Sequence, residues 1–376
     1  MTERGSLFMH FRTAACAFAC VITILSPASA RDLSESDYAR ANAVLPEGYV
    51  LPRAEALARI TATLSASTVQ FCKARTGRAP DDAVARFDAA FDAWIRVRHL
   101  SFGPFEFFLR GNRFQYSPDP GRRVARDLDA LIARKDVASL APREFAKGSV
   151  TLQGFPALEI LFYDPKARVA LRRSDGEGDY RCRVAQAIAR NMAEMAAGVV
   201  ADWRGGGGEP FLQVMTRPRS GNAYYQTHRE VALQFFKNLY GGLDLLADVK
   251  LAPVLGPSLS EARPELEESP ASGRSLAHVI SSLEALEALY AAGLEGLLRA
   301  SGNDTDLAPL LRRAFRMTIA TARGIDVPLA RAVADPAARR QVEKLLLQIR
   351  ALKQLVSRRL SAATGLVVGF NALDGD

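Results

Sequence analysis

The sequence has few of the side chains from which most metal and redox sites are built. Its 376 residues include four cysteines, four histidines and two tryptophans. No Cys-x-x-Cys pair occurs, which excludes a cysteine zinc cluster and a thioredoxin-like redox motif. No His-Glu-x-x-His segment occurs either, so the common zinc-peptidase motif is missing. The sequence therefore offers few of the side chains that common metal and redox centres use.

Long apolar runs are scarce as well, and the one that exists lies near the start. Residues 14–25 follow two arginines and precede the small residues 28–30, which is the pattern of a secretory signal peptide. We expect residues 1–30 to be that signal, cleaved after Ala30, and the mature protein to reach the periplasm. Lipid anchoring at Cys20 is the less favoured alternative, because the apolar run continues past it. No later stretch has the ~20 apolar residues that a membrane helix needs, so we expect no transmembrane helix after signal removal.

Signal removal leaves two cysteines, Cys72 and Cys182. An even pair in an oxidising compartment predicts a disulfide. The bond would close a long loop and stabilise the fold by roughly 4–5 kcal/mol in the chain-entropy model. Two buried free thiols are the alternative.

The charge balance is moderately basic. The whole chain carries a formal +8, which falls to +7 when Glu3, Arg4 and Arg12 leave with the signal. A basic exported protein can contact acidic surfaces or anionic ligands. We expect no nucleic acid as partner, because no Lys/Arg run is interleaved with aromatic residues.

Apolar residues recur at helical spacing along most of the chain, and no convincing alternating strand pattern occurs. The sequence therefore predicts an all-α fold. Three stretches read as irregular: a lead-in over 31–52, a charged loop over 165–180 and a loop over 250–257. Four consecutive glycines, 205–208, predict a break between two halves. The helices are expected over 53–75, 81–99, 124–132, 182–203, 229–246, 275–290, 307–322 and 335–356.

One apolar stretch, residues 152–164, carries a single carboxylate in its middle, Glu159. Pro156 fits the first turn of a helix, where its missing N–H costs nothing. Glu159 is then expected within that first turn, where the helix dipole favours a negative charge. The residues that follow are apolar at helical spacing, which predicts a buried helix that carries a charge. A buried charge needs a partner or a function, and the alternative is a glutamate that caps the helix.

The pattern Gly-x-Pro-x-x-Glu resembles the signature of the imelysin-like family, whose usual form is Gly-x-His-x-x-Glu. Gly154 and Glu159 match it, and Pro156 stands where the family usually has histidine; a periplasmic branch of iron-regulated proteins and predicted lipoproteins is similar to this form. Other pieces resemble that branch in order, so the resemblance spans nearly the whole mature chain. They are Trp94, Phe102-Gly103-Pro104, Pro118-Asp119, Arg122-Arg123, Asp248, Lys250-Leu251, Pro253, Arg263-Pro264, Arg274-Ser275, Ile280 and the tail 369–376.

The resemblance implies two helical-bundle halves, 31–204 and 209–376, related by internal duplication. The signature helix is then expected to face a groove between the halves. Its implied role is a non-catalytic binding component for the uptake of iron or another divalent metal, with Glu159 as candidate metal ligand in the motif that Gly154 begins. Three basic residues are candidates to hold an anionic ligand or chelate instead: Lys250, Arg263 and Arg274.

Two alternatives come with the family. One is a metallopeptidase, but zinc peptidases need two or three imidazole or carboxylate ligands, and Pro156 lacks the imidazole of the motif. The other is a docking protein for a periplasmic partner in redox or uptake chemistry. A nucleophilic site is not recognisable from spacing, although a serine that pairs with a distant histidine stays open.

Overall fold

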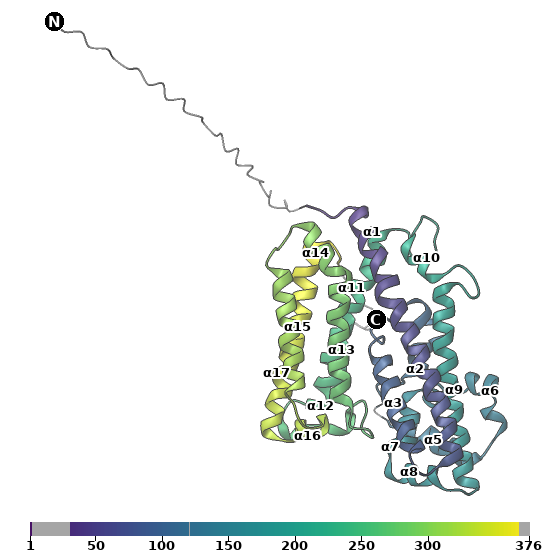
Figure 1. Cartoon of the computed structure of the whole chain (residues 1–376). Coiled ribbons are helices and arrows are strands. Elements are labelled where there is room, and N and C mark those ends of the chain that lie inside the picture. Colours follow the sequence, from purple (N-terminus) through teal and green to yellow (C-terminus); the bar gives the residue numbers. More distant parts are fainter. Residues whose placement is uncertain (2–30, 120, 368–376) are drawn as a thin grey trace.

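The computed structural model describes residue 1, residues 31–119 and residues 121–367. All regular structure in these residues is helical (Figure 1), which confirms the all-α prediction. The predicted signal peptide, its cleavage site and the C-terminal tail lie outside the described residues. Within the described ranges, no helix is both long and apolar enough to span a bilayer.

The first group of helices is built around α2 (Leu51–Ala74), which packs along α3 (Ala79–Ile95) and α9 (Gly176–Arg204). The predicted apolar stripes of these helices, among them Leu57, Phe87 and Ile188, are fully buried. Shorter helices cover the lower part of this group in Figure 1: α5 (Arg123–Arg134), α6 (Pro142–Lys147), α7 (Phe155–Tyr163) and α8 (Pro165–Arg172). A further short helix, α4 (Arg110–Phe114), precedes them in the chain.

The second group lies beside the first and contains the long helices α11 (His228–Asp244), α13 (Ser275–Leu289), α15 (Leu307–Arg323) and α17 (Pro336–Gln354). Their inward faces bury apolar residues at the predicted 3.6-residue period. Four short helices close the ends of this group: α12 (Ala252–Leu255), α14 (Glu295–Ser301), α16 (Leu329–Ala334) and α18 (Ser361–Thr364).

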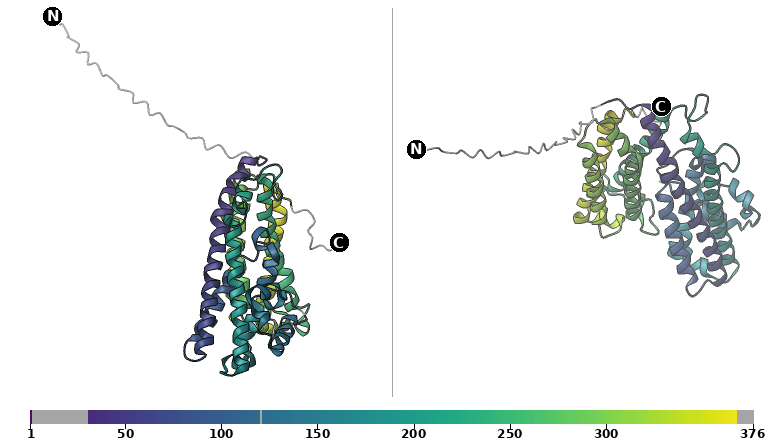
Figure 2. Two further views of the ribbon diagram at one scale, coloured as in Figure 1. Left: turned by 90° about the vertical axis from the view of Figure 1, so that its right-hand side faces the viewer. Right: turned by 45° about the horizontal axis from the view of Figure 1, so that its top comes forward.

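The predicted irregular lead-in is wrong. Residues 35–44 form α1 (Glu35–Val44), which continues through a π-helical turn, η1 (Leu45–Val50), into α2. Together they make one rod that runs the length of the molecule (Figure 2). Pro46 lies just after the start of the π-helical turn and Pro52 just after its end, and the backbone stays right-handed helical at both junctions.

Two other expected loops are helical as well. The charged loop over 165–180 contains α8 and the first residues of α9, because Asp164 and Asp175 cap these helices through their side chains. The loop over 250–257 instead holds the end of a π-helical segment, η6 (Leu245–Leu251), followed by α12. Lys250 thus stands on a helix.

The two groups are not cleanly separated in sequence. Helix α1 packs on α11 of the second group, and α10 (Phe211–Thr216) packs back on α9. Helix α9 ends at Arg204 and Gly205 takes a left-handed backbone with φ 92°, so the glycine run does stop the helix. The domain boundary over 204–209 and the internal duplication stay predictions.

The predicted disulfide is confirmed. Cys72, near the end of α2, is bonded to Cys182 on α9. The bond ties the two longest helices of the first group together over a sequence separation of 110 residues.

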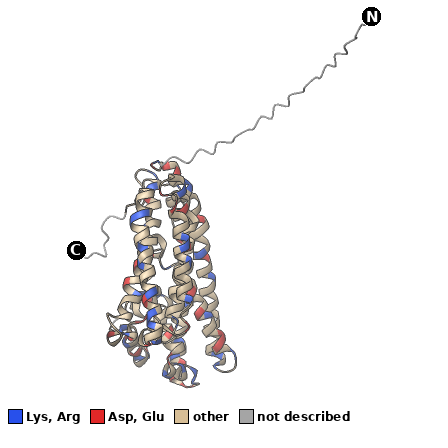
Figure 3. Cartoon of the chain, turned by 90° about the vertical axis from the view of Figure 1, so that its left-hand side faces the viewer, with Lys and Arg blue, Asp and Glu red and all other residues tan. Residues whose placement is uncertain are grey.

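Charges of both signs are mixed on the outer face of the second group. Figure 3 shows Lys and Arg interleaved with Asp and Glu over this face. Several of them pair across helices, for example Arg350 with Asp248 and Arg323 with Glu284. The basic composition therefore does not gather into a continuous stripe there.

Candidate functional site

Helix α7 begins at Phe155, so Glu159 is its fifth residue and lies beyond the first turn. The prediction of a first-turn carboxylate is wrong, and so is the capping alternative. The reason is that the backbone is already helical one residue before Pro156, directly after the extended Gly154.

Gly154 is required for its small size, and it has no side-chain atom that could bind a ligand. A Cβ at this position would lie 2.1 Å from the carbonyl oxygen of Phe114 and 2.2 Å from that of Arg113. Only glycine lets the start of α7 lie directly against the end of α4. This contact fixes where α7, and with it Glu159, sits in the first group.

The carboxylate of Glu159 is hydrogen-bonded to Ser272, in the segment that precedes α13 of the second group. Its side chain is 3% exposed, and its Oε1 accepts hydrogen bonds from the backbone N–H of Ser272 at 2.9 Å and from the Ser272 hydroxyl at 2.5 Å. Among the described residues no donor bonds to Oε2. Burial raises the pKa of Glu159 to about 7 although the Ser272 bonds oppose it, and the nearby charges of Glu268 and Glu267 add to the rise. Glu159 therefore holds its proton at a higher pH than an exposed glutamate does.

Lys250 belongs to an ion-paired group of three. Its Nζ is 2.6 Å from Oε2 of Glu268, and Arg98 from the first group contacts the other oxygen of Glu268. Burial lowers the pKa of Lys250 to about 8. Although burial acts to raise it, the charges of Lys250 and Arg98 lower the pKa of Glu268 to about 2. The group bridges the two halves as two positive charges around one negative charge.

The other two basic candidates are placed differently. Arg274 pairs with Asp92 at 2.6 Å and with Asp88 at 3.4 Å, both on α3, and Tyr163 donates a hydrogen bond to Asp88 at 2.5 Å. Arg274 thus fastens the second group to the first. Arg263 is exposed and does not line the cavity described next.

A cavity of about 1250 Å³ opens between the two groups, in front of Glu159. Pro156, Glu159 and Ile160 form part of its wall from the first group, and Lys250 and Glu268 part of its wall from the second. Nine acidic and five basic side chains line it, so acidic groups are in excess among the lining residues, and one of them, Asp248, is paired with Arg350 and Lys353 outside the lining. The acidic residues are Asp119, Asp129, Glu159, Asp164, Glu177, Asp248, Glu265, Glu267 and Glu268; the basic ones are Arg98, Arg122, Lys166, Arg181 and Lys250.

The structure also gathers a serine, a histidine and an aspartate. The hydroxyl of Ser269 lies 3.1 Å from Nδ1 of His278, and Oδ1 of Asp92 lies 3.9 Å from Nε2. The order resembles a nucleophilic triad, but Ser269 and His278 are both fully buried and neither lines the cavity. Burial lowers the pKa of His278 to about 3. We assign this group to the packing between α3 and α13.

The histidines do not meet at the site. His99 is buried against the hydroxyl of Tyr49, and His228 lies beside Asn42. Among the described residues, no three His, Cys, Asp or Glu side chains are arranged so as to surround a metal ion. A metal that contacts Glu159 would therefore keep water or ligands of its own.

Sequence reasoning missed Arg98, Ser272, Glu267 and Glu268. Glu267 and Glu268 stand in the segment between α12 and α13 without any motif spacing, and Ser272 follows in the same segment. They reach the site only because this segment folds over the first group.

The comparisons with known proteins agree with this architecture. Residues 50–356 match the family model described as Imelysin. The chain belongs to the imelysin family. Comparison with curated proteins gives no match.

Two solved structures share this imelysin fold. An imelysin-like protein from Psychrobacter arcticum 273-4 superposes with a TM-score of 0.72 at 18% identity, over 91% of this chain and 100% of that chain. A precursor named as iron-regulated protein A, from Parabacteroides distasonis ATCC 8503, gives a TM-score of 0.71 at 13% identity, over 87% of this chain and 96% of that one. At these identities the similarity establishes the fold.

Proposed function

We propose that this imelysin-family protein is an exported, non-catalytic binding protein that carries a metal cation, in the first place iron, in the groove between its two halves. The observation that carries the proposal is the buried carboxylate of Glu159, which faces a cavity whose lining is acidic overall. A cavity whose lining carries an excess of one charge favours ions of the opposite sign. Carboxylate oxygens suit hard cations, ferric iron among them.

The size of the cavity and its donors define the form of the cargo. The volume of about 1250 Å³ is far larger than a bare ion needs. Because the described donors do not form a complete coordination shell, the cation enters with water or ligands of its own. The acidic lining favours a hydrated cation or a cationic complex over an anionic chelate.

Three further observations support the proposed role and location. The N-terminal sequence has the layout of a secretory signal. The disulfide between Cys72 and Cys182 fits an oxidising compartment. One of the similar folds carries the name iron-regulated protein A. The peptidase alternative has no specific observation in its favour. Position 156 holds proline rather than histidine, and Ser269 and His278 are buried and do not line the cavity.

The proposal is tested by titration calorimetry with two cations, ferrous iron under anaerobic conditions and the exchange-inert complex hexaamminecobalt(III). The cobalt complex has the size of a hydrated ion and can bind only through its own ligands. We expect both to bind, to weaken at least tenfold in Glu159→Gln, and to tighten as the pH rises through about 7, because the proton on Glu159 competes with the cation.

The matched control is Glu265→Gln, which removes an exposed carboxylate from the same lining. We expect this variant to bind both cations nearly as the parent protein does. Elemental mass spectrometry on protein purified from the periplasm without chelators then shows which metal it carries. Absence of saturable binding for both cations, or equal binding by parent and Glu159→Gln, would overturn the proposal.

A further inference from the structure

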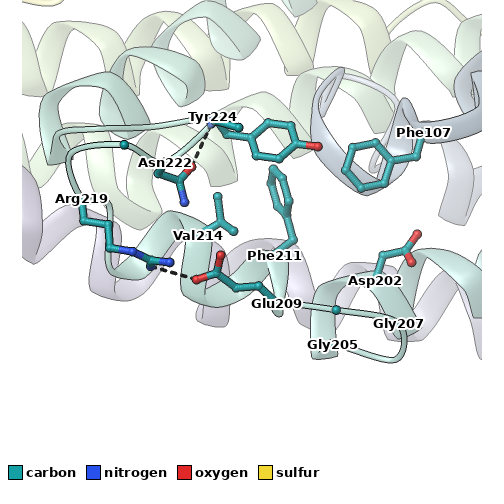
Figure 4. A pocket seen from close by; sticks show the side chains of 13 residues that line it. Phe107, Asp202, Gly205, Gly207, Glu209, Phe211, Val214, Arg219, Asn222 and Tyr224 are labelled. Carbon is teal, nitrogen blue, oxygen red and sulfur yellow. Dashed lines mark hydrogen bonds and ion pairs between the residues drawn. The ribbon is translucent and has the colours of Figure 1, made fainter.

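A second cavity lies at the other end of the first group, where α9 stops and the chain returns through α10. Its volume is about 430 Å³. It is lined by Phe107 and by residues between Asp202 and Tyr224, including three of the four consecutive glycines (Figure 4). None of these residues lines the groove.

Three aromatic rings form one side of this cavity. Phe211 is 5.2 Å from Tyr224 and 5.8 Å from Phe107, measured between ring centroids, and Phe107 is 6.2 Å from Tyr224. Phe211 is buried, whereas Tyr224 is 53% exposed. The faces of such rings carry partial negative charge and attract cations, and the rings also offer apolar surface.

Two carboxylates complete the cavity. Arg110 contacts one oxygen of Asp202 at 2.5 Å, and Arg219 contacts one oxygen of Glu209 at 2.9 Å. The second oxygen of each has no donor among the described residues. The pair of Arg219 and Glu209 is exposed on both sides and therefore weak, so another cation can replace Arg219.

The two residues that follow Phe107 in the chain are apolar, and their backbone is strained. Phe108 and Leu109 are consecutive and both left-handed, with φ of 57° and 59°, which is disfavoured for large side chains. Their side chains are 75% and 55% exposed. Backbone strain of this kind concentrates at binding sites. Here it belongs to the turn that presents Phe107 to the cavity.

We propose that this cavity binds an organic cation on an apolar stem, that is, a primary ammonium or a guanidinium group. Asp202 and Glu209 hold the charge, and the rings of Phe107, Phe211 and Tyr224 cover it. We place the stem against the exposed side chains of Phe108 and Leu109, which directly follow Phe107 in the chain. A free alkylamine and a lysine or arginine side chain of another protein share this chemistry. The proposal does not depend on the function of the groove.

The first test is titration calorimetry of the full mature protein with n-butylammonium and n-butylguanidinium. Butanol and pentanoate have the same butyl stem without the positive charge and serve as controls. We expect saturable binding of the two cations and none of the controls. Affinity should fall at least tenfold in the double variant Asp202→Asn/Glu209→Gln, and also in Tyr224→Ala, while Glu159→Gln leaves it unchanged.

Because Asp202 also binds Arg110, the double variant can lose stability. Glu209→Gln and Tyr224→Ala change exposed side chains and keep the test valid in that case. Absence of saturable binding for both cations, or equal binding by the parent, Glu209→Gln and Tyr224→Ala, would overturn the proposal.

A second titration distinguishes the two sources of the cation. The probe is the peptide acetyl-Leu-Arg-Leu-amide. Binding at least tenfold tighter than n-butylguanidinium, with that gain lost in Phe108→Ala, assigns the site to a protein side chain. Equal affinity for peptide and butylguanidinium assigns it to a free cation.

Discussion

Two hydrogen bonds from Ser272 offset part of the cost of burying the carboxylate of Glu159. The offset is incomplete, because burial still raises its pKa to about 7. A glutamate whose proton is held more tightly in the folded state stabilises that state at low pH. This contribution is lost as the pH rises from about 4.5 through about 7.

We therefore expect Glu159→Gln to change how stability depends on pH. The free energy of unfolding of the parent should fall relative to that of the variant between pH 4.5 and 7, by about 3 kcal/mol in total since each pKa unit is worth about 1.4 kcal/mol. Urea unfolding of both proteins at pH 4.5, 6 and 7.5 measures this difference. A constant difference across the three values would contradict the raised pKa.

The sequence could identify Glu159 because it is a lone charge within an apolar run. It could not identify the partners of that charge. Ser272 lies 113 residues further along the chain, and Glu268 lies 170 residues from Arg98. No local pattern encodes which distant segment folds over a helix, so of the second wall only Lys250 was predicted, from the family resemblance. Arg263, predicted on resemblance alone, is not part of the cavity.

Among the helices, the long amphipathic ones could be predicted because their burial repeats every 3.6 residues over many turns. The errors fall where proline or a dense charge pattern suggested a loop. In the lead-in, Pro46 and Pro52 lie at the two junctions between the π-helical turn η1 and the α-helices on either side of it. In the stretch over 250–257, the π-helical segment η6 shifts the register and carries Lys250 on a helix.

Helix α7 provides a test at this scale, because its position depends on one glycine. In Gly154→Ala the new methyl group would lie 2.1 Å from a backbone oxygen that cannot move aside like a flexible side chain. We expect a loss of at least about 1–3 kcal/mol in the free energy of unfolding, the usual effect of overpacking, measured by urea denaturation.

The control for this variant is Gly241→Ala in α11, where a Cβ meets no atom within 4 Å. We expect that substitution to stabilise the protein by about 0.5–1 kcal/mol, since alanine is the better helix former. Similar changes in both variants would show that Gly154 is not held by the close contact with Phe114.

In the whole molecule, the two groups of helices are joined through polar contacts around the groove. Ser272 bonds to Glu159, Arg274 to Asp88 and Asp92, and Arg98 to Glu268. All three second-group residues come from one segment between α12 and α13. This segment therefore forms part of one wall of the groove. It also supplies much of the polar contact that connects the two groups.

Glu268 is the residue on which this connection depends most, because it separates two buried cations. Its side chain is 6% exposed, and those of Lys250 and Arg98 are 7% and 14% exposed. Glu268→Ala leaves the two positive charges without their shared partner, and we expect a loss of about 3–5 kcal/mol in the free energy of unfolding. Glu144→Ala, which removes an exposed pair with Lys147, should change nothing measurable.

The double variant Glu268→Leu/Lys250→Met distinguishes the effect of lost charge on stability from the effect of lost side-chain volume. It removes one charge of each sign and keeps the space filled, so most of the lost stability should return. Urea unfolding of the parent, Glu268→Leu, Lys250→Met and the double variant gives the coupling energy between the two residues. A double variant as unstable as Glu268→Ala would mean that Arg98 alone requires the carboxylate, and that Lys250 is held in the groove wall by packing rather than by charge.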